Sequence, residues 1–242
     1  MIKKVRIGNM EIGGIPRIVA TLHKETEIKR LESPPMHKAI DIVEVRADKL
    51  YKGSRDKLET IIRKIRQNNF PVILTAREGE GYRFSHSERL AVFSEFISLV
   101  DAVDIELTSV DSAKVVAKVK EQGKTVIISH HDFKKTPSAS FLKGIMERAA
   151  GKGADIVKVA VQPLTPLDAA ALMCLCMDIS GKYPAVFISM GKVGEFTRIY
   201  APFFGSCLTY GYISEPAAPG QMKVVEIDKQ LSCFYRELHK RL

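Results

Sequence analysis

One lysine of this chain stands where covalent chemistry needs an amine. Lys158 lies in the middle of the apolar, β-branched segment 155–161, where its side chain has no helical surface along which to reach water. If burial and arginines such as Arg46 or Arg77 favour the neutral amine, Lys158 can attack a ketone and form an imine. The alternative is a structural ion pair between Lys158 and one of the acidic residues Glu44, Asp48, Asp104 and Glu106.

A pair of histidines ends another apolar segment and offers the proton transfers that imine chemistry requires. Segment 125–131 ends in Ser129-His130-His131 and is followed by Asp132. Because side chains alternate along a strand, only one of the two histidines can face the interior of a barrel. An isolated histidine is more often a surface residue or a core residue than a catalytic one. Because this histidine ends a strand among other charged strand ends, we give the catalytic role and the surface or core role equal weight.

Further charged residues gather at the ends of two earlier segments. Segment 42–48 ends in Glu44-Val45-Arg46-Ala47-Asp48, and a strand that continued through Asp48 would place all three charges on one face. Segment 71–77 ends in Thr75-Ala76-Arg77. Unpaired charges are costly inside a barrel, so we expect this cluster at the mouth, paired and touching substrate. The alternative is a solvated edge strand.

Two segments near the carboxyl end are suited to an anionic ligand. Arg198 follows shortly after Ser189-Met190-Gly191, and the loop 214–221 ends in Ala218-Pro219-Gly220-Gln221. An arginine and an amide together can hold a carboxylate by directed hydrogen bonds. Phosphate is the usual ligand at this place in a barrel, but the Gly-rich helix start that phosphate needs is weak here.

These residues must be positioned by a repeated strand–helix framework. Eight apolar segments alternate with stretches of helical length, and most are continuous rather than alternating, as parallel strands covered on both faces should be. An open doubly wound sheet is the alternative, but no GxGxxG follows the first segment. We therefore predict an α/β fold, a (β/α)8 TIM barrel. The predicted strands are Arg17–Leu22, Ile42–Asp48, Pro71–Arg77, Ala102–Leu107, Thr125–His131, Asp155–Val161, Ala185–Met190 and Ser206–Ile213.

Helix signals lie between these segments. A helix opens at Ser54, with apolar residues at helical spacing, and Ser109 or Asp111 could cap another that runs through Lys114 to Glu121. Further helices are predicted from Ser138 to Ala150, Pro166 to Ser180 and Ile227 to His239. Residues 1–16 fit no strand–helix unit and predict a β-hairpin over the bottom of the barrel. Since nothing resembles a linker, we expect residues 1–242 to form a single domain.

Composition and charge restrict the function further. The net charge is +9, but the basic residues are spread along helical segments without interleaved aromatics, which favours small carboxylates over nucleic acid as the ligand. No apolar run is long enough to cross a membrane. The four cysteines form no CxxC pair, so we expect neither a disulfide nor a bound metal. The expected location is the cytoplasm.

Residues from 17 to 221 together resemble type I 3-dehydroquinate dehydratases. Each motif is weak alone, but all of them occur in consistent order. The matching motifs are Glu44-Val45-Arg46-Ala47-Asp48, Thr75-Ala76-Arg77, Ser129-His130-His131-Asp132-Phe133 with Thr136-Pro137, Gly153-Ala154-Asp155-Ile156-Val157-Lys158, Ser189-Met190-Gly191-Lys192, Thr197-Arg198, Phe204-Gly205-Ser206 and Ala218-Pro219-Gly220-Gln221.

The resemblance implies elimination of water from 3-dehydroquinate, in the shikimate pathway, through an imine at Lys158. It implies that His131 moves protons with Glu80 as its partner, that no cofactor is needed and that the protein is a homodimer. The alternative is a class I Schiff-base aldolase or another imine-forming lyase on the same barrel. Substrate-binding roles are implied for Glu44, Arg46, Arg77, Met190, Arg198, Tyr210, Ala217, Ala218 and Gln221.

Several positions depart from the family pattern. Glu80-Gly81-Tyr82 stands where an acidic residue and two glycines are usual. Ala217 replaces a common serine, which removes a hydroxyl contact. Tyr210 replaces a common phenylalanine and Ile188 a common methionine, and both keep an apolar wall.

Overall fold

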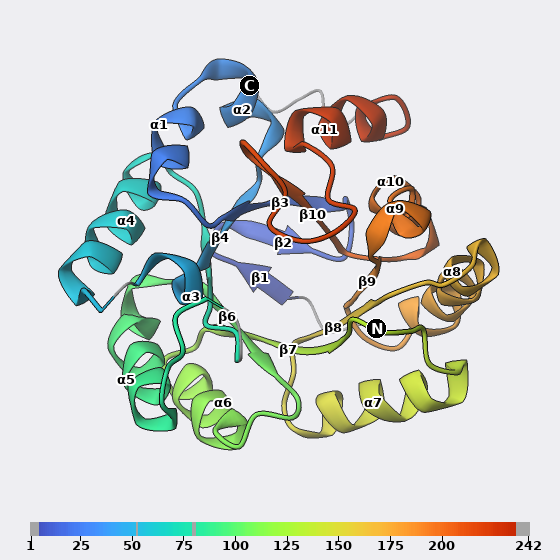
Figure 1. The fold of residues 1–242 in the computed structure, drawn as a ribbon, viewed down its shortest axis with the longest axis horizontal. Helices are drawn as coiled ribbons and strands as arrows, with labels where there is room; N and C mark the ends of the chain where they lie inside the picture. Colours follow the sequence, from blue (N-terminus) through green and yellow to red (C-terminus); the bar gives the residue numbers. More distant parts are fainter. Residues whose placement is uncertain (1–4, 52, 79–80, 236–242) are drawn as a thin grey trace.

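A ring of parallel strands forms the centre of the molecule, and helices surround it (Figure 1). The computed structural model describes residues 5–51, 53–78 and 81–235. The eight strands run in the order β10-β3-β4-β5-β6-β7-β8-β9, and each neighbouring pair is parallel. These strands are β3 (Arg17–Leu22), β4 (Ile42–Arg46), β5 (Val72–Thr75), β6 (Ala102–Glu106), β7 (Thr125–Asp132), β8 (Ile156–Val161), β9 (Ala185–Ser189) and β10 (Leu208–Tyr212).

The last two strands bring the sheet close to a closed barrel. Ala185 of β9 forms an isolated parallel bridge with Ser206, and Cys207 N donates to Ala185 O at 2.9 Å. The predicted (β/α)8 barrel is therefore confirmed. All eight predicted strand segments contain a strand, and the boundaries differ by a residue or two at most ends.

Helices follow the strands around the outside of the ring (Figure 1). Their apolar faces pack on the outward-facing strand residues in the large core cluster. Ser54 caps α4 by accepting a hydrogen bond from Lys57 N. Asp111, one of the two predicted cap residues, stands at the N-cap position of α6 but forms no capping hydrogen bond with a described residue. The helices are α1 (Ile28–Leu31), α2 (Pro34–Ala39), α3 (Ala47–Leu50), α4 (Arg55–Gln67), α5 (His86–Phe96), α6 (Ser112–Glu121), α7 (Ala139–Gly151), α8 (Pro166–Ser180), α9 (Gly191–Gly194), α10 (Thr197–Tyr200) and α11 (Val224–Ser232), with short 3-10 turns η1 (Glu25–Glu27), η2 (Ile97–Leu99) and η3 (Ala201–Phe204). Within the described part of the chain, no helix has the length and apolar character that a bilayer span requires.

The interior of the barrel is filled from its amino-terminal end by the predicted hairpin. β1 (Val5–Ile7) pairs antiparallel with β2 (Met10–Ile12). Val5, Ile7 and Ile12 are buried in the inner core cluster, together with strand residues such as Ile127 and Ile156. With its bottom end plugged in this way, the barrel is open to a ligand at the carboxyl ends of its strands.

Two sequence predictions were wrong in detail. β4 ends at Arg46 rather than Asp48, because the chain turns there into the short helix α3, which contains Asp48. The last helix was predicted from Ile227 to His239, but α11 begins at Val224 and ends at Ser232; residues 236–242 lie outside the described part of the chain.

Candidate active site at the carboxyl ends of the strands

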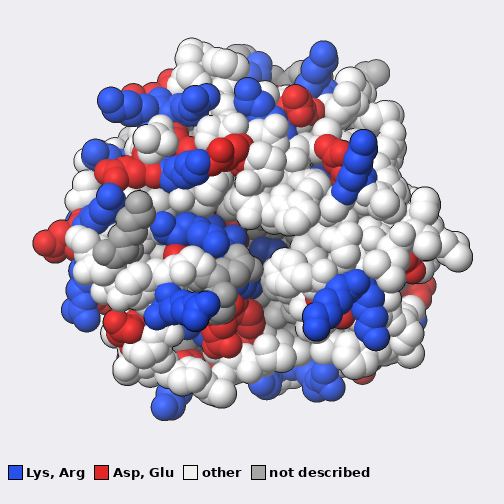
Figure 2. All heavy atoms as spheres, viewed as in Figure 1, with Lys and Arg blue, Asp and Glu red and all other residues white. Residues whose placement is uncertain are grey.

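A cavity of about 230 Å³ opens at the carboxyl-terminal end of the barrel. Figure 2 shows this face with a hollow near its centre and basic side chains around it. Every predicted site residue that the structure describes lines the cavity; Glu80 lies outside the described residues. The lining residues are Thr21, Glu44, Arg46, Arg77, His131, Phe133, Lys158, Ala160, Ile188, Met190, Arg198, Tyr210, Ala217, Ala218, Pro219 and Gln221.

Lys158 is buried in the middle of β8, with only 4% of its surface exposed. Its Nζ donates to Asp104 Oδ2 at 2.9 Å and lies 3.6 Å from Glu44 Oε1. The same Nζ lies 3.9 Å from the centre of the Tyr210 ring, close enough for a cation–π interaction. The ion-pair alternative considered from the sequence thus describes a real contact, and it coexists with a place on the cavity wall.

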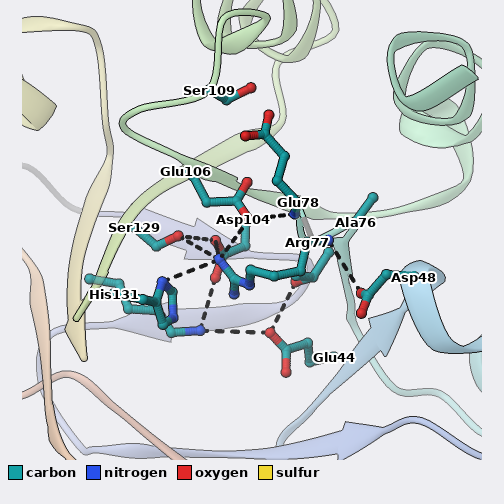
Figure 3. A network of polar contacts seen from close by, with 12 residues as sticks. Glu44, Asp48, Ala76, Arg77, Glu78, Asp104, Glu106, Ser109, Ser129 and His131 are labelled. Carbon is teal, nitrogen blue, oxygen red and sulfur yellow. Dashed lines mark hydrogen bonds and ion pairs between the residues drawn. The ribbon is translucent and has the colours of Figure 1, made fainter. Parts of the chain in front are cut away.

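Figure 3 shows the polar network around Arg77, which joins the ends of β5, β6 and β7. Its NH1 lies 3.5 Å from Asp104 Oδ1 and 3.4 Å from Glu106 Oε1, and it donates to Ser129 Oγ at 3.0 Å. Burial alone would lower the pKa of Arg77, but the two carboxylates outweigh it and raise that pKa. Arg77 therefore stays charged in the wall of the cavity.

His131 is the histidine that faces the cavity. Burial lowers its pKa well below the ordinary value, and the positive charges of Arg77 and Lys158 lower it further. Arg77 NH1 lies 3.4 Å from Nδ1, a contact that a neutral ring accepts and a protonated ring does not. The ring is therefore neutral at physiological pH and able to take a proton.

His130 points the other way, as strand alternation requires. It does not line the cavity, and its ring makes an edge contact with Phe141 of α7, with ring centres 6.4 Å apart. Burial lowers the pKa of His130 as well, and its Nε2 finds no hydrogen-bond partner among the described residues.

Glu44 and Arg46 project from β4 into the cavity, but each is held differently. Both carboxylate oxygens of Glu44 are occupied, because Thr75 donates to Oε1 at 2.9 Å and Thr21 donates to Oε2 at 3.1 Å. Arg46 forms two hydrogen bonds to Asp48, of 2.9 and 2.6 Å. Asp48 reaches Arg46 because α3 folds the chain back, and not because the two residues share a strand face.

Arg198 is the buried guanidinium with the poorest set of partners. NH1 donates to Tyr210 O at 3.4 Å and Nε is unpartnered; among the described residues Arg198 forms no ion pair. Burial lowers its pKa to about 10, even though Glu195 and Glu44 act in the opposite direction. A buried cation without a counter-charge is the expected resting state of a carboxylate receptor.

The loop between β10 and α11 crosses the mouth of the barrel (Figure 1). Gln221 folds this loop, since its Oε1 accepts from Ala217 N at 2.7 Å and Ala218 N at 3.2 Å, while Nε2 donates to Thr21. Gly220 has φ of +69°, and a side chain there would place Cβ 2.3 Å from Gly191 O. The loop can approach the cavity only with glycine at this position.

The sequence did not single out every residue that the structure brings to the site. Thr21 lines the cavity and connects Glu44 to Gln221. Ser129 and Asp104 lie directly below it, joined by a 2.6 Å hydrogen bond. From the sequence, Asp104 was named only as a possible ion-pair partner of Lys158, and Ser129 only as part of a motif. For Thr21, a polar residue inside a buried strand was the available signal, as it was for Lys158. Among the described residues, no group of three or more His, Cys, Asp or Glu side chains is arranged to hold a metal ion.

Comparisons with known proteins agree on one family. A family model described as type I 3-dehydroquinase matches residues 18–237. The 3-dehydroquinate dehydratase of Methanosarcina barkeri is 40% identical over 243 residues, covering 94% of this chain and 98% of the relative. The enzyme of the same name from Methanococcoides burtonii is 35% identical over 233 residues, with the same coverage.

Solved structures give the same result for the fold. The chain is similar to 3-dehydroquinate dehydratase from Geobacillus kaustophilus, with a TM-score of 0.88, 26% identity and 97% of each chain covered. It is also similar to a type I enzyme from Clostridium difficile with covalently modified comenic acid, with a TM-score of 0.88, 28% identity and coverage of 98% and 100%.

Proposed function

Because the chain belongs to the type I 3-dehydroquinase family, and is thus a hydro-lyase of the shikimate pathway that dehydrates 3-dehydroquinate, we propose that Lys158 forms an imine with the substrate ketone. The observation that carries this proposal is the position of Nζ. It is an amine on the cavity wall, buried among strands and surrounded by the ionisable groups that proton transfer needs.

The proposed reaction begins when neutral Lys158 attacks the ketone carbon and a carbon–nitrogen bond forms. The resulting carbinolamine loses the ketone oxygen as water and becomes an iminium. The iminium withdraws electrons from the neighbouring carbon, so a proton on that carbon becomes acidic. His131 accepts this proton and returns it to the departing hydroxyl, which leaves as water, and hydrolysis of the iminium releases product and Lys158.

Arg198 is proposed to hold the substrate carboxylate. It is the cavity arginine without an ion-pair partner among the described residues, whereas Arg46 has Asp48, and Arg77 has Asp104 and Glu106. A planar guanidinium can donate two parallel hydrogen bonds to one carboxylate. Gln221 and Glu44 line the same cavity, linked through Thr21, and are proposed to contact substrate hydroxyls together with Arg46 and Arg77.

The remaining predicted residues complete this proposal. Met190, Tyr210, Ala217 and Ala218 line the cavity and would shape it around a six-membered ring. Glu80 is proposed as the partner that orients His131, on the basis of the family motif alone. No metal or organic cofactor enters the proposed steps, because the iminium is itself the electron sink.

Location and assembly are part of the proposal. We propose a homodimer in the cytoplasm. The apolar surface formed by Phe196, Tyr200, Phe203 and Phe234 supports self-association, since its rings contact one another and each is more than 40% exposed. Sedimentation velocity should give twice the mass of one chain, and a monomer at all concentrations would exclude a dimer.

The function is tested by following the product. Incubation with 3-dehydroquinate should produce the conjugated enone of 3-dehydroshikimate, which absorbs in the ultraviolet, with no cleavage of a carbon–carbon bond. Lys158→Met, which keeps the length of the side chain but has no amine, should abolish the product. Retro-aldol fragments would instead favour the aldolase alternative.

A further inference from the structure

Asp104 is a buried carboxylate to which the proposed mechanism assigns no task. It lies in the middle of β6, its side chain is 0% exposed, and it is not among the residues that line the cavity. Even so, its Oδ2 is the acceptor nearest to the reactive atom, 2.9 Å from Lys158 Nζ. A charged side chain is rarely placed in the centre of a barrel unless its charge is used or compensated.

The surroundings hold Asp104 in one orientation and in its ionised form. Ser129 donates to Oδ1 at 2.6 Å and in turn accepts from Arg77 (Figure 3). Oδ2 is left to accept from Lys158 Nζ. Burial alone would raise the pKa of Asp104, but the charges of Lys158 and Arg77 outweigh it and hold that pKa far below its ordinary value. The carboxylate is therefore negative throughout the range in which an enzyme works.

The chemistry of an imine makes such a fixed negative charge useful. A lysine ammonium carries one positive charge and three N–H donors, whereas the iminium carries the same charge and a single N–H. In a cavity filled by substrate, that N–H has no water to bind, and an unsatisfied buried cation is strongly disfavoured. An acceptor already in place on the protein side satisfies both the ammonium and the iminium without rearrangement.

Glu44 is less suited to that task, although it is the other carboxylate near Lys158. It lies 3.6 Å from Nζ, beyond a good hydrogen bond, and its two oxygens already accept from Thr75 and Thr21. The Tyr210 ring, on a different strand, adds a favourable face for a cation but accepts no conventional hydrogen bond.

We propose that Asp104 is a catalytic residue, an inference that rests on the proposed imine at Lys158. Its Oδ2 is the counter-ion that accepts the N–H of Lys158 both before the lysine reacts and in the iminium. Ser129 is then a positioning residue that directs Oδ2 toward Nζ. Asp104 transfers no proton and forms no bond. Its role is to keep the positive charge on nitrogen at low cost while the neighbouring carbon loses its proton.

Asp104→Asn tests the charge alone, because asparagine has the same shape and retains an oxygen that can accept. We expect turnover of 3-dehydroquinate to fall by about 10- to 100-fold, the usual effect of losing one charged hydrogen bond. Trapping of the Lys158 adduct by borohydride should slow in parallel. A purely structural aspartate would alter stability but not these rates in the folded protein.

A second measurement reports on the charge directly. Acetylation of Lys158 by a neutral ester, followed across pH by mass spectrometry, shows where the amine loses its proton. Removing the negative neighbour should move the midpoint to lower pH. The other groups around Nζ stay in place in this variant: Glu44 of β4, Arg77 after β5, His131 of β7 and Tyr210 of β10.

Asp41→Asn is the matched control. Asp41 is equally buried, at 1% exposed, but it lies at the opposite end of the barrel, where it accepts from Ile18 N. The Asp41→Asn variant should be less stable than the wild type, but its acetylation midpoint at Lys158 and its rate of borohydride trapping should be unchanged. If Asp104→Asn does not fold, Ser129→Ala retains the charge and removes only its orientation; turnover should then fall at least about threefold with little change in midpoint.

The outcomes separate this inference from the function on which it rests. The role of Asp104 would be overturned if Asp104→Asn kept wild-type turnover and an unshifted acetylation midpoint. If Ser129→Ala has to be used instead, wild-type turnover in that variant would overturn it. If the unaltered enzyme is trapped at another lysine, the imine proposal itself fails. Trapping at Lys158 together with loss of turnover in Asp104→Asn supports both.

Discussion

Replacing Arg198 by methionine should stabilise the protein while it destroys substrate recognition. Arg198 is 3% exposed and, within the described part of the chain, has no ion pair. Burial lowers its pKa from 12.5 to about 10, which corresponds to roughly 3 kcal/mol of free energy against the charged form. Since the guanidinium is still charged at pH 7, the folded state carries this penalty and the unfolded state does not.

Methionine has a similar length and no charge, so it removes the penalty and fills most of the volume. The carbonyl of Tyr210 loses its weak donor, at 3.4 Å, and this loss offsets about 1 kcal/mol of the stability gained by removing the charge. The net expectation is a gain of about 2 kcal/mol in the free energy of unfolding, or roughly 4–8 °C in Tm for a chain of this size. Calorimetry without ligand measures it.

The same variant should lose most of its catalytic efficiency. A charge-assisted hydrogen bond contributes about 1.5–3 kcal/mol, so kcat/KM for 3-dehydroquinate should fall at least about 10- to 100-fold. Arg198→Lys keeps the charge but not the planar pair of donors, and it should raise KM far more than it changes Tm. Bound product should raise the Tm of the wild type and leave that of the methionine variant nearly unchanged.

Arg46→Met is the contrasting control. Without the Arg46 guanidinium, the buried Asp48 carboxylate loses both of the hydrogen bonds that it accepts from Arg46. The free energy of unfolding of this variant should therefore fall by about 3–5 kcal/mol. If Arg198→Met is instead destabilised and its KM is unchanged, the carboxylate is recognised elsewhere, and Arg46 or Arg77 becomes the candidate.

The other predictions concern proton transfer. His131→Ala should lose roughly 10²-fold or more in turnover yet still be trapped by borohydride. His130→Ala changes a ring outside the cavity and should keep most activity. If His130→Ala lost more activity than His131→Ala, the assignment of strand faces would be wrong. Because burial and two nearby cations depress the pKa of His131, its ring should stay neutral as pH falls to 6.5, and an NMR titration of the free enzyme should place its midpoint below that pH; a midpoint above pH 6.5 would contradict this buried, cation-flanked setting. Glu80→Gln should lower turnover while leaving the Lys158 adduct intact, and a silent variant would make Glu80 a solvated loop carboxylate.

The barrel was predictable because its strands are uniform. Mostly apolar segments such as 125–129 and 156–161 are buried on both faces, and few other folds use eight of them in alternation with helices. The boundaries were less predictable, since they depend on local turns. Arg46 ends its strand with φ of −80° and ψ of 85°, and nothing in the residue types distinguishes that turn from a further strand residue.

The cavity residues were found from the sequence mainly where a family motif contains them. The contacts between these residues were not predicted, because they depend on how the strands are aligned around the barrel. Ser129 lies opposite Lys158 in one strand pair and opposite Glu106 in the next, which is how Asp104 comes to lie between Lys158 and Arg77. Arg198 has no ion-pair partner among the described residues, and this too is a property of the assembled site and not of any segment.

Covalent trapping tests the central claim most directly. The enzyme would be incubated with 3-dehydroquinate, reduced with borohydride, digested, and mapped by mass spectrometry, with Lys158→Met and a sample without substrate as controls. We predict a single substrate-dependent adduct, on the peptide that contains Lys158, and its absence from both controls. An active enzyme that yields no adduct, or an adduct on a different lysine, would contradict the imine at Lys158.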